Sequence, residues 1–226
     1  MIPCISVENM RLSDAYTIEN FLPSLTLMHR AAMGVFKAVK WQGSTAIVVG
    51  SGNNGGDGFA LACILQEHGF DCTVFTVSKH LSADSVFYAE KAKAARILVI
   101  PFEKGCLENF FIVVDCLLGT GFSGGLRDNY QEAIEEINRS SAYVVSLDIN
   151  SGMNGDTGEA ELAVYSDLTV TIGYIKTGLT AKNAGKYIKR LVCADIGILL
   201  VRKEGEITEE NCPPWLDMNT ITALES

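Results

Sequence analysis

The 226-residue chain has few of the residues that build thiol and transition-metal chemistry. It contains three histidines and seven cysteines, and no two cysteines form a CxxC pair. An odd number of cysteines without such pairs argues against a disulfide framework and against a zinc site, so we expect reduced thiols. No histidine shows a pairing with a cysteine, and we therefore expect no catalytic cysteine.

Long apolar runs and an excess of positive charge are also absent. No segment offers the roughly 18 or more continuous apolar residues that a membrane helix needs. Residues 1–6 lack a charged stretch followed by an apolar one, so we expect no secretory signal and a cytoplasmic location. The net charge of −9 disfavours nucleic acid as a partner. A phosphate-bearing ligand is still allowed, because backbone N–H groups at a helix N-terminus bind phosphate without net positive charge.

Apolar strand patterns alternate with helical patterns along the chain. We expect one domain over residues 1–226, with a mainly parallel sheet covered by helices on both faces. The helices are predicted within 10–40 (divided near Pro23 and Ser24) and at 58–68, 82–95 and 128–140. The strands are predicted at 45–49, 73–77, 110–115, 143–148 and 168–172. The charged tail after about Arg202, with Pro213 and Pro214, is expected to be loosely packed.

Polar clusters follow three of these strands, where open α/β sheets bind their ligands. The first cluster, Gly50–Gly58, has the GxGxxG spacing that lets a backbone approach a pyrophosphate. The next strand ends without the acidic residue that holds a ribose in ordinary dinucleotide folds, which disfavours hydride transfer. The polar residues inside this cluster indicate a ligand site more specifically than its glycines do. The alternative is a plain strand-to-helix turn in which Asp57 caps the helix.

The second and third clusters each begin at an aspartate that ends an apolar strand. Asp115 precedes a glycine-rich loop, 116–125, which could wrap a ligand through backbone groups or could be a long connection. Asp148 opens the third cluster, 148–158, and its carboxylate is expected to face the same crevice. Asp156 and Thr157 are expected to form a turn.

Together these three motifs resemble the NAD(P)H-hydrate epimerase family. The resemblance rests on the sequence Asn-Asn-Gly-Gly-Asp-Gly at 53–58, on Gly-Thr-Gly-Phe-Ser-Gly at 119–124, and on Leu-Asp-Ile-x-Ser-Gly at 147–152. It extends from Met10 to Ile198, which is most of the chain. Three motifs in order are far more specific than any one of them.

This resemblance implies a three-layer α-β-α Rossmann-like sandwich, usually dimeric, that binds hydrated NADH or NADPH (NADHX or NADPHX) and one potassium ion. Asp148 would lie at the reacting ring as the catalytic residue. The ion would be held by Asn54, Asp115 and Ser151, whose oxygen donors suit such a cation. The residues implied in substrate binding, besides Asp148, are Asn53, Asn54, Gly55, Gly56, Asp57, Gly119, Thr120, Gly121, Phe122, Ser123, Gly124 and Gly125. A separate ATP- or ADP-dependent dehydratase would be the functional partner.

Two departures from the family pattern bear on these expectations. Asn150 stands where the family commonly has proline, which could alter the turn that presents Ser151. The segment Met28–Ala32 replaces a Met-Glu-Asn-Ala-Gly-like helix and could form a wall of the site or a dimer contact.

The chemistry expected at the site is acid–base catalysis by a carboxylate. The hydrogen on the hydroxylated carbon is not acidic, so direct proton abstraction is a poor route. Instead, the lone pair of the ring nitrogen would expel the hydroxyl as water, or the ring would open. Water or the ring nitrogen would then add to the carbon from the other face. Asp148 is the first candidate for the acid and base, and Asp57 is the second. Lys176 could pair with a phosphate or could be a solvated lysine. The rival functions are a non-catalytic binding or scaffold module of the same fold and an ordinary NAD(P)-dependent oxidoreductase.

Overall fold

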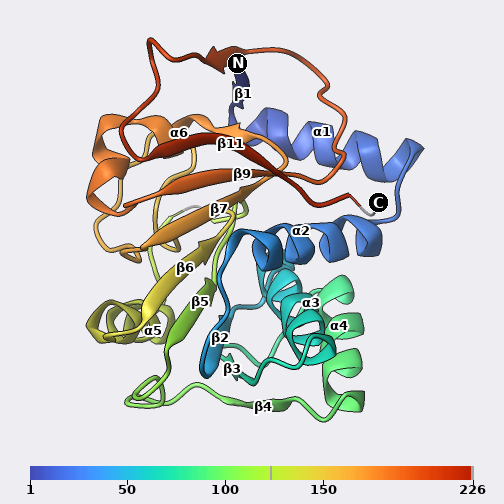
Figure 1. The fold of residues 1–226 in the computed structure, drawn as a ribbon, viewed down its shortest axis with the longest axis vertical. Coiled ribbons are helices and arrows are strands. Elements are labelled where there is room, and N and C mark those ends of the chain that lie inside the picture. The colour runs from blue at the N-terminus through green and yellow to red at the C-terminus, as the bar shows by residue number, and fades with distance from the viewer. Residues whose placement is uncertain (123, 225–226) are drawn as a thin grey trace.

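A computed structural model describes residues 1–122 and 124–224, and its centre is a sheet of eight parallel strands (Figure 1). In spatial order the strands are β11 (Leu216–Thr222), β9 (Leu191–Asp195), β7 (Leu168–Ile172), β6 (Tyr143–Leu147), β5 (Ile112–Cys116), β2 (Thr45–Val49), β3 (Cys72–Thr76) and β4 (Leu98–Pro101). All five predicted strands are present, and the parallel sheet confirms the predicted fold class.

Helices cover both faces of this sheet and make the fold a three-layer sandwich (Figure 1). The helices are α1 (Val7–Asn20), α2 (Ser24–Ala38), α3 (Asn53–Glu67), α4 (Ala83–Ala94), α5 (Asp128–Arg139) and the short α6 (Thr177–Thr180). Successive residues of a strand point to opposite faces, so Ile47 and Val49 pack with α2, α3 and α4, while Ala46 and Val48 pack with α5. The strands are therefore apolar on both sides, which explains their continuous apolar sequence.

The order of the strands reverses between β2 and β5. From β2 the chain moves outward through β3 to β4, and it then returns to β5 on the other side of β2 and continues toward β11. In open α/β sheets such a reversal leaves a crevice at the carboxyl ends of the two central strands. The clusters after β2 and β5 border this crevice, and the cluster after β6 lies one strand away.

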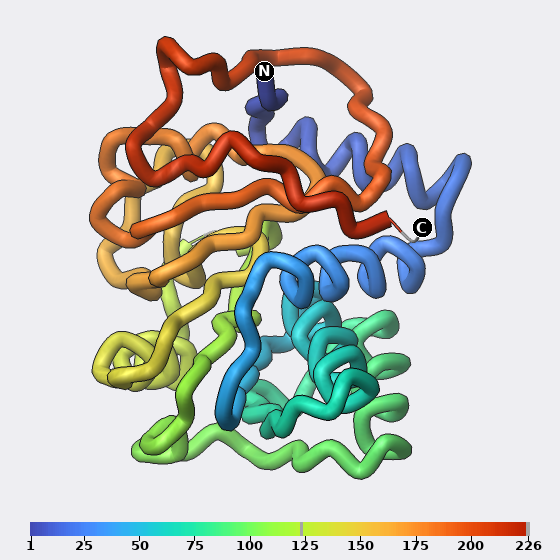
Figure 2. The backbone as a smooth tube through the Cα atoms, viewed as in Figure 1, coloured from blue at the N-terminus to red at the C-terminus, as the bar shows by residue number. Residues whose placement is uncertain are grey.

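The first and last segments of the chain meet in a second, smaller sheet. Strand β1 (Ile2–Ile5) pairs antiparallel with β10 (Gly205–Ile207) and parallel with β8 (Ile175–Lys176). Figure 2 shows the C-terminal segment crossing above the large sheet near the N-terminus. The expectation of a loosely packed tail after Arg202 is wrong, because β11 extends the large sheet and Ala223 is buried.

Helix α3 begins five residues before its predicted start, at Asn53 instead of 58. Its first turn is built from residues of the first polar cluster, with Gly52 at the N-cap position. A Cβ atom at Gly55 would lie 2.4 Å from the carbonyl oxygen of Gly50, and one at Gly58 would lie 2.8 Å from Val49 Cγ1. The glycines are needed for this close packing, whereas their low helix propensity had suggested a loop.

Candidate active site

A cavity of about 360 Å³ lies at the carboxyl ends of the central strands and collects residues from all three polar clusters. Its lining includes Asn53, Asn54, Asp57, Gly119, Thr120, Gly121 and Asp148. The predicted convergence of the clusters in one crevice is therefore present. The other walls come from α1 and α2, which contribute residues such as Met10 and Met28. Of the segment Met28–Ala32, Met28 and Ala31 line the cavity, so this helix forms part of its wall.

Asp148 stands directly after β6 in a backbone conformation that few residues other than glycine adopt. Its φ angle is +69°, in the left-handed region, and its N–H donates to the carbonyl of Val170 at 2.8 Å. The side-chain oxygen Oδ1 accepts the backbone N–H of Ile172 at 3.2 Å. The other oxygen, Oδ2, faces the glycine loop, since a methyl group at Gly119 would come within 3.5 Å of it. Strained backbone of this kind is concentrated at functional sites.

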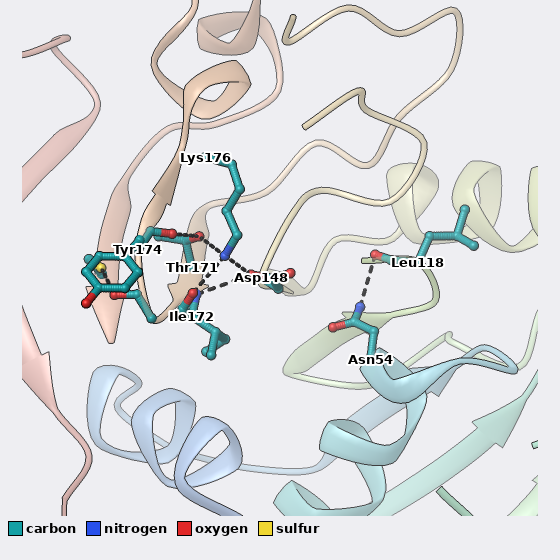
Figure 3. A network of polar contacts seen from close by, with 9 residues as sticks. Asn54, Leu118, Asp148, Thr171, Ile172, Tyr174 and Lys176 are labelled. Carbon is teal, nitrogen blue, oxygen red and sulfur yellow. Dashed lines mark hydrogen bonds and ion pairs between the residues drawn. The ribbon is translucent and has the colours of Figure 1, made fainter. Parts of the chain in front are cut away.

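Lys176 forms an ion pair with Asp148 and is buried, with 1% of its side chain exposed (Figure 3). The interpretation of this lysine as a solvated side chain is wrong, because it is buried, whereas its pairing with a phosphate stays a prediction. Its ammonium group also donates to Thr171 Oγ1 at 3.1 Å and to the carbonyl of Ile172 at 2.7 Å. The sequence could not reveal this pairing, because Lys176 lies in a two-residue strand, 28 positions after its partner.

Asp57 lies in the first turns of α3 and borders the same cavity. Burial, and then the nearby charge of Asp148, raise the pKa of the Asp57 carboxyl well above its usual range. The pKa of Asp14, on α1, is also raised by burial and by Asp148. The site therefore combines an ion-paired aspartate with two carboxyl groups that retain their protons more readily than exposed ones. Asp14 was missed in the sequence because it sits in a helix without any motif.

The loops after β2 and β5 touch, and glycine makes this contact possible. A Cβ atom at Gly50 would lie 1.9 Å from the carbonyl oxygen of Leu117, which no side chain could tolerate. Across this junction Asn54 Nδ2 donates to the carbonyl of Leu118 at 3.0 Å (Figure 3). On its other side the loop is met by α1, where Arg11 donates to the carbonyl of Thr120 at 2.5 Å.

Three predicted cation ligands, Asn54, Asp115 and Ser151, surround this junction. Asp115 is fully buried, and its partners in the described part of the chain are neutral: the hydroxyls of Ser146 and Ser151 and the backbone N–H groups of Leu117 and Ser151. Asn54 Oδ1 is buried and has no hydrogen-bond partner among the described residues. Ser151 Oγ lies 3.3 Å from the same Leu118 carbonyl that Asn54 contacts.

These observations fit a monovalent cation with hard oxygen ligands. A buried carboxylate without a positive partner and an unsatisfied amide oxygen are both costly, and one cation would relieve both. A site for a softer metal is not present in the described residues, since no group of three or more His, Cys, Asp or Glu side chains is placed to bind one.

Asn150, which departs from the family pattern, holds the turn before Ser151 in place. Its side chain is fully buried, and Nδ2 donates to the carbonyl of Val164 at 2.9 Å and to Ser166 Oγ at 3.0 Å. Its Oδ1 accepts the hydroxyl of Thr169 at 2.6 Å. These hydrogen bonds fix the turn, as the ring of a proline would, and Ser151 keeps its contact with Asp115.

The remainder of the predicted substrate-binding loop lies beside a second cavity of about 680 Å³. Phe122, Gly124 and Gly125 line this second cavity and not the first, and Ser123 lies outside the described residues. Gly55 and Gly56 are buried in α3 and do not line the first cavity; they pack closely against Gly50 and against Met28 and Ser85, respectively. The turn expected at Asp156 and Thr157 is present.

The seven cysteines are free thiols, as expected. Within residues 1–122 and 124–224, no helix has the length and apolar character needed to cross a bilayer.

Comparison with known proteins gives a family match and several close relatives. Residues 24–178 match the family described as YjeF-related protein N-terminus. A protein of Limosilactobacillus reuteri named NAD(P)H-hydrate epimerase is 39% identical over 210 residues, covering 87% of this chain and 97% of that protein. A Rhodopirellula baltica protein of the same name is 36% identical, covering 88% of this chain and 86% of the relative.

Two further comparisons concern domain context and fold. A bifunctional NAD(P)H-hydrate repair enzyme of Archaeoglobus fulgidus is 37% identical over 86% of this chain but only 41% of its own length. A crystal structure of a yeast protein superposes with a TM-score of 0.73 at 19% identity, covering 92% of this chain and 98% of the yeast chain. At that identity the superposition supports the fold alone.

Proposed function

The chain belongs to the family of YjeF-related N-terminal domains, and from that membership we propose that it is an NAD(P)H-hydrate epimerase. It interconverts the R and S forms of hydrated NADH and NADPH, so that damaged nicotinamide nucleotides can be repaired. The observation that carries this proposal is the placement of Asp148. Its Oδ1 atom is paired with Lys176, and its Oδ2 atom faces the glycine loop at a cavity lined by residues of all three motifs.

The proposed reaction exchanges one hydroxyl group without abstracting a proton from carbon. The lone pair of the ring nitrogen forms a C=N bond as the adjacent C–O bond breaks, and an acid protonates the departing oxygen to give water. A water molecule then adds from the opposite face, its proton passes to a carboxylate, and the electron pair returns to nitrogen. The intermediate is a cation, which a nearby carboxylate stabilises.

We assign the charge-stabilising and proton-accepting role to Asp148, because Oδ1 is paired with Lys176 and Oδ2 faces the glycine loop that lines the cavity. Asp57 is the second carboxyl group at the same cavity, and its raised pKa suits a group that holds a proton for the leaving oxygen. Assigning the proton-donating and proton-accepting roles to two different carboxyl groups refines the expectation that Asp148 alone serves as acid and base. Two carboxyl groups with opposite environments commonly take opposite roles.

The dinucleotide phosphates are proposed to lie along the loop from Gly119 to Gly125, next to the N-terminus of α3. Residues 53–57, which form this end of α3, would also contact the ligand. A potassium ion held by Asn54, Asp115 and Ser151 would order the junction of the two loops and offset phosphate charge. The neutral partners of Asp115 and the unsatisfied oxygen of Asn54 support this assignment.

The chain is further proposed to be a single cytoplasmic domain over residues 1–226 that forms a homodimer. Helix α1 exposes large apolar side chains, including Leu12, Tyr16 and Ile18, that suit contact with a second copy. An ATP- or ADP-dependent dehydratase is the proposed functional partner. The bifunctional relatives are named as repair enzymes, and this chain matches about two fifths of their length.

The decisive assay is the conversion of one hydrated NADH stereoisomer into the other, followed by chiral chromatography against the uncatalysed blank. We expect a rate well above the blank, and we expect potassium to increase it. A rate equal to the blank together with clear dinucleotide binding would favour the scaffold alternative. Hydride transfer to or from a simple substrate would favour an oxidoreductase.

A further inference from the structure

We propose that Lys176 is a positioning residue for the reaction, which holds the side chain of Asp148 in one orientation with its Oδ2 atom directed at the substrate. This inference rests on the proposed function and extends it to a residue that no motif marks. The contacts of Lys176, the strand in which Lys176 lies, and the charges around the cavity support this role.

The contacts of Lys176 leave its ammonium group fully engaged and fixed. Its three donors are matched by Asp148 Oδ1, by Thr171 Oγ1 at 3.1 Å and by the carbonyl of Ile172 at 2.7 Å. The backbone N–H of Ile172 also donates to Asp148 Oδ1 at 3.2 Å. Two donors therefore converge on one oxygen of the carboxylate and fix its rotation, which leaves Oδ2 for the cavity (Figure 3).

The small sheet fixes the position of Lys176 from the other side. Strand β1 pairs with β8 so that Ile5 lies beside Lys176, and Ile5 is fully buried. The lysine therefore lies beside the N-terminal strand, and its ammonium group contacts Asp148 after β6 and Thr171 and Ile172 on β7. A flexible, exposed lysine could not hold a carboxylate in one orientation, whereas a fully buried one can.

The charges around the cavity explain why such a partner is needed. The titratable and charged groups around the cavity and near Asp148 are Arg11 and Asp14 on α1, Asp57 on α3, Asp84 in the first turn of α4, Lys176 on β8 and Cys193 on β9. Carboxyl groups outnumber cations here, and like charges repel one another. Lys176 is the cation that pairs directly with Asp148, so it offsets this repulsion where the carboxylate must be held in place.

The test is the kcat and KM of epimerase activity in Lys176→Met and Lys176→Arg, with Lys189→Met as a matched control. Lys189 forms an exposed ion pair with Asp167 and does not line the cavity. We expect Lys176→Met to lower kcat about 100-fold, the loss expected when a reacting group is misplaced by about 1 Å. We expect its KM to change little, because Lys176 orients Asp148 and does not bind the dinucleotide in this proposal.

Lys176→Arg is expected to recover part of the kcat that Lys176→Met loses, since it retains the charge but alters the geometry. Dinucleotide affinity should change little in either variant, and Lys189→Met should match the wild type in both readouts. A folded Lys176→Met enzyme with the kcat of the wild type would overturn the proposal, and so would a Lys176→Arg enzyme no more active than Lys176→Met.

If Lys176→Met does not fold, the decision passes to Lys176→Gln, which removes the charge and the ion pair but keeps a polar side chain at this position. A lowered kcat with little change in KM in that variant supports the proposal, and a wild-type kcat overturns it. A wild-type enzyme without epimerase activity would instead refute the proposed function, so the two failures are distinguishable.

Discussion

Gly119 offers the sharpest test of where the reaction takes place, because a single methyl group there would enter the cavity without disturbing the core. A Cβ atom at this position would lie 3.5 Å from Asp148 Oδ2 and 3.3 Å from Asn54 Cβ. Gly119 does not have a positive φ, so alanine fits its backbone. The methyl group would therefore occupy the space next to the oxygen that we assign to the reaction.

The expected magnitude follows from these distances. A substrate hydroxyl must approach Oδ2 to within about 2.6–3.2 Å for proton transfer. A methyl carbon already 3.5 Å from that oxygen forces the hydroxyl aside by about 1 Å, which costs about 100-fold in rate. The contact with Asn54 needs a shift of only a few tenths of an ångström. We therefore expect the free energy of unfolding to change by less than about 1 kcal/mol.

The assay is kcat for stereoisomer conversion, measured beside the melting temperature. The matched control is Gly205→Ala in β10, where a Cβ atom would make an ordinary contact of 3.6 Å with the carbonyl of Cys4. It should match the wild type in rate. Full activity in a correctly folded Gly119→Ala enzyme would show that the substrate does not react at Oδ2, and the proposed geometry would be refuted.

Two further predictions concern pH and potassium. Folding raises the pKa of the Asp57 carboxyl, so the wild type loses stability as pH rises from about 4 toward neutrality. Asp57→Asn lacks this carboxyl and should therefore be increasingly more stable than the wild type over that range. A constant difference between the melting temperatures of the two proteins at all pH values would contradict this. Replacing potassium chloride with choline chloride should lower the melting temperature and kcat of the wild type, because a cation bound only by the folded state stabilises it. Asn54→Ala should abolish that difference, and equal wild-type melting in both salts would contradict the proposed site.

The parts of the fold that follow from local patterns were predictable from the sequence. Continuous apolar runs such as 45–49 and 168–172 mark strands that are buried on both faces, and their alternation with helices predicts a parallel sheet. The aspartates at 115 and 148 could be placed at the crevice because the carboxyl ends of parallel strands share one edge.

The parts that depend on distant pairing were not predictable in the same way. Strands β1, β8 and β10 are only two to four residues long, and each is stabilised by partners far away in the chain. Strand β11 has polar residues and follows two prolines, yet it pairs along β9. The partnership of Lys176 with Asp148 depends on this long-range arrangement, so the sequence could not distinguish a buried ion pair from a solvated lysine.

The central claim is that Asp148 carries out the chemistry of an epimerase. The most direct measurement compares wild type and Asp148→Asn in the conversion of hydrated NADH stereoisomers, with dinucleotide affinity measured on the same samples. We predict that the wild type exceeds the uncatalysed rate, whereas Asp148→Asn falls to that rate and still binds the dinucleotide. Conversion by Asp148→Asn at the wild-type rate would contradict the account.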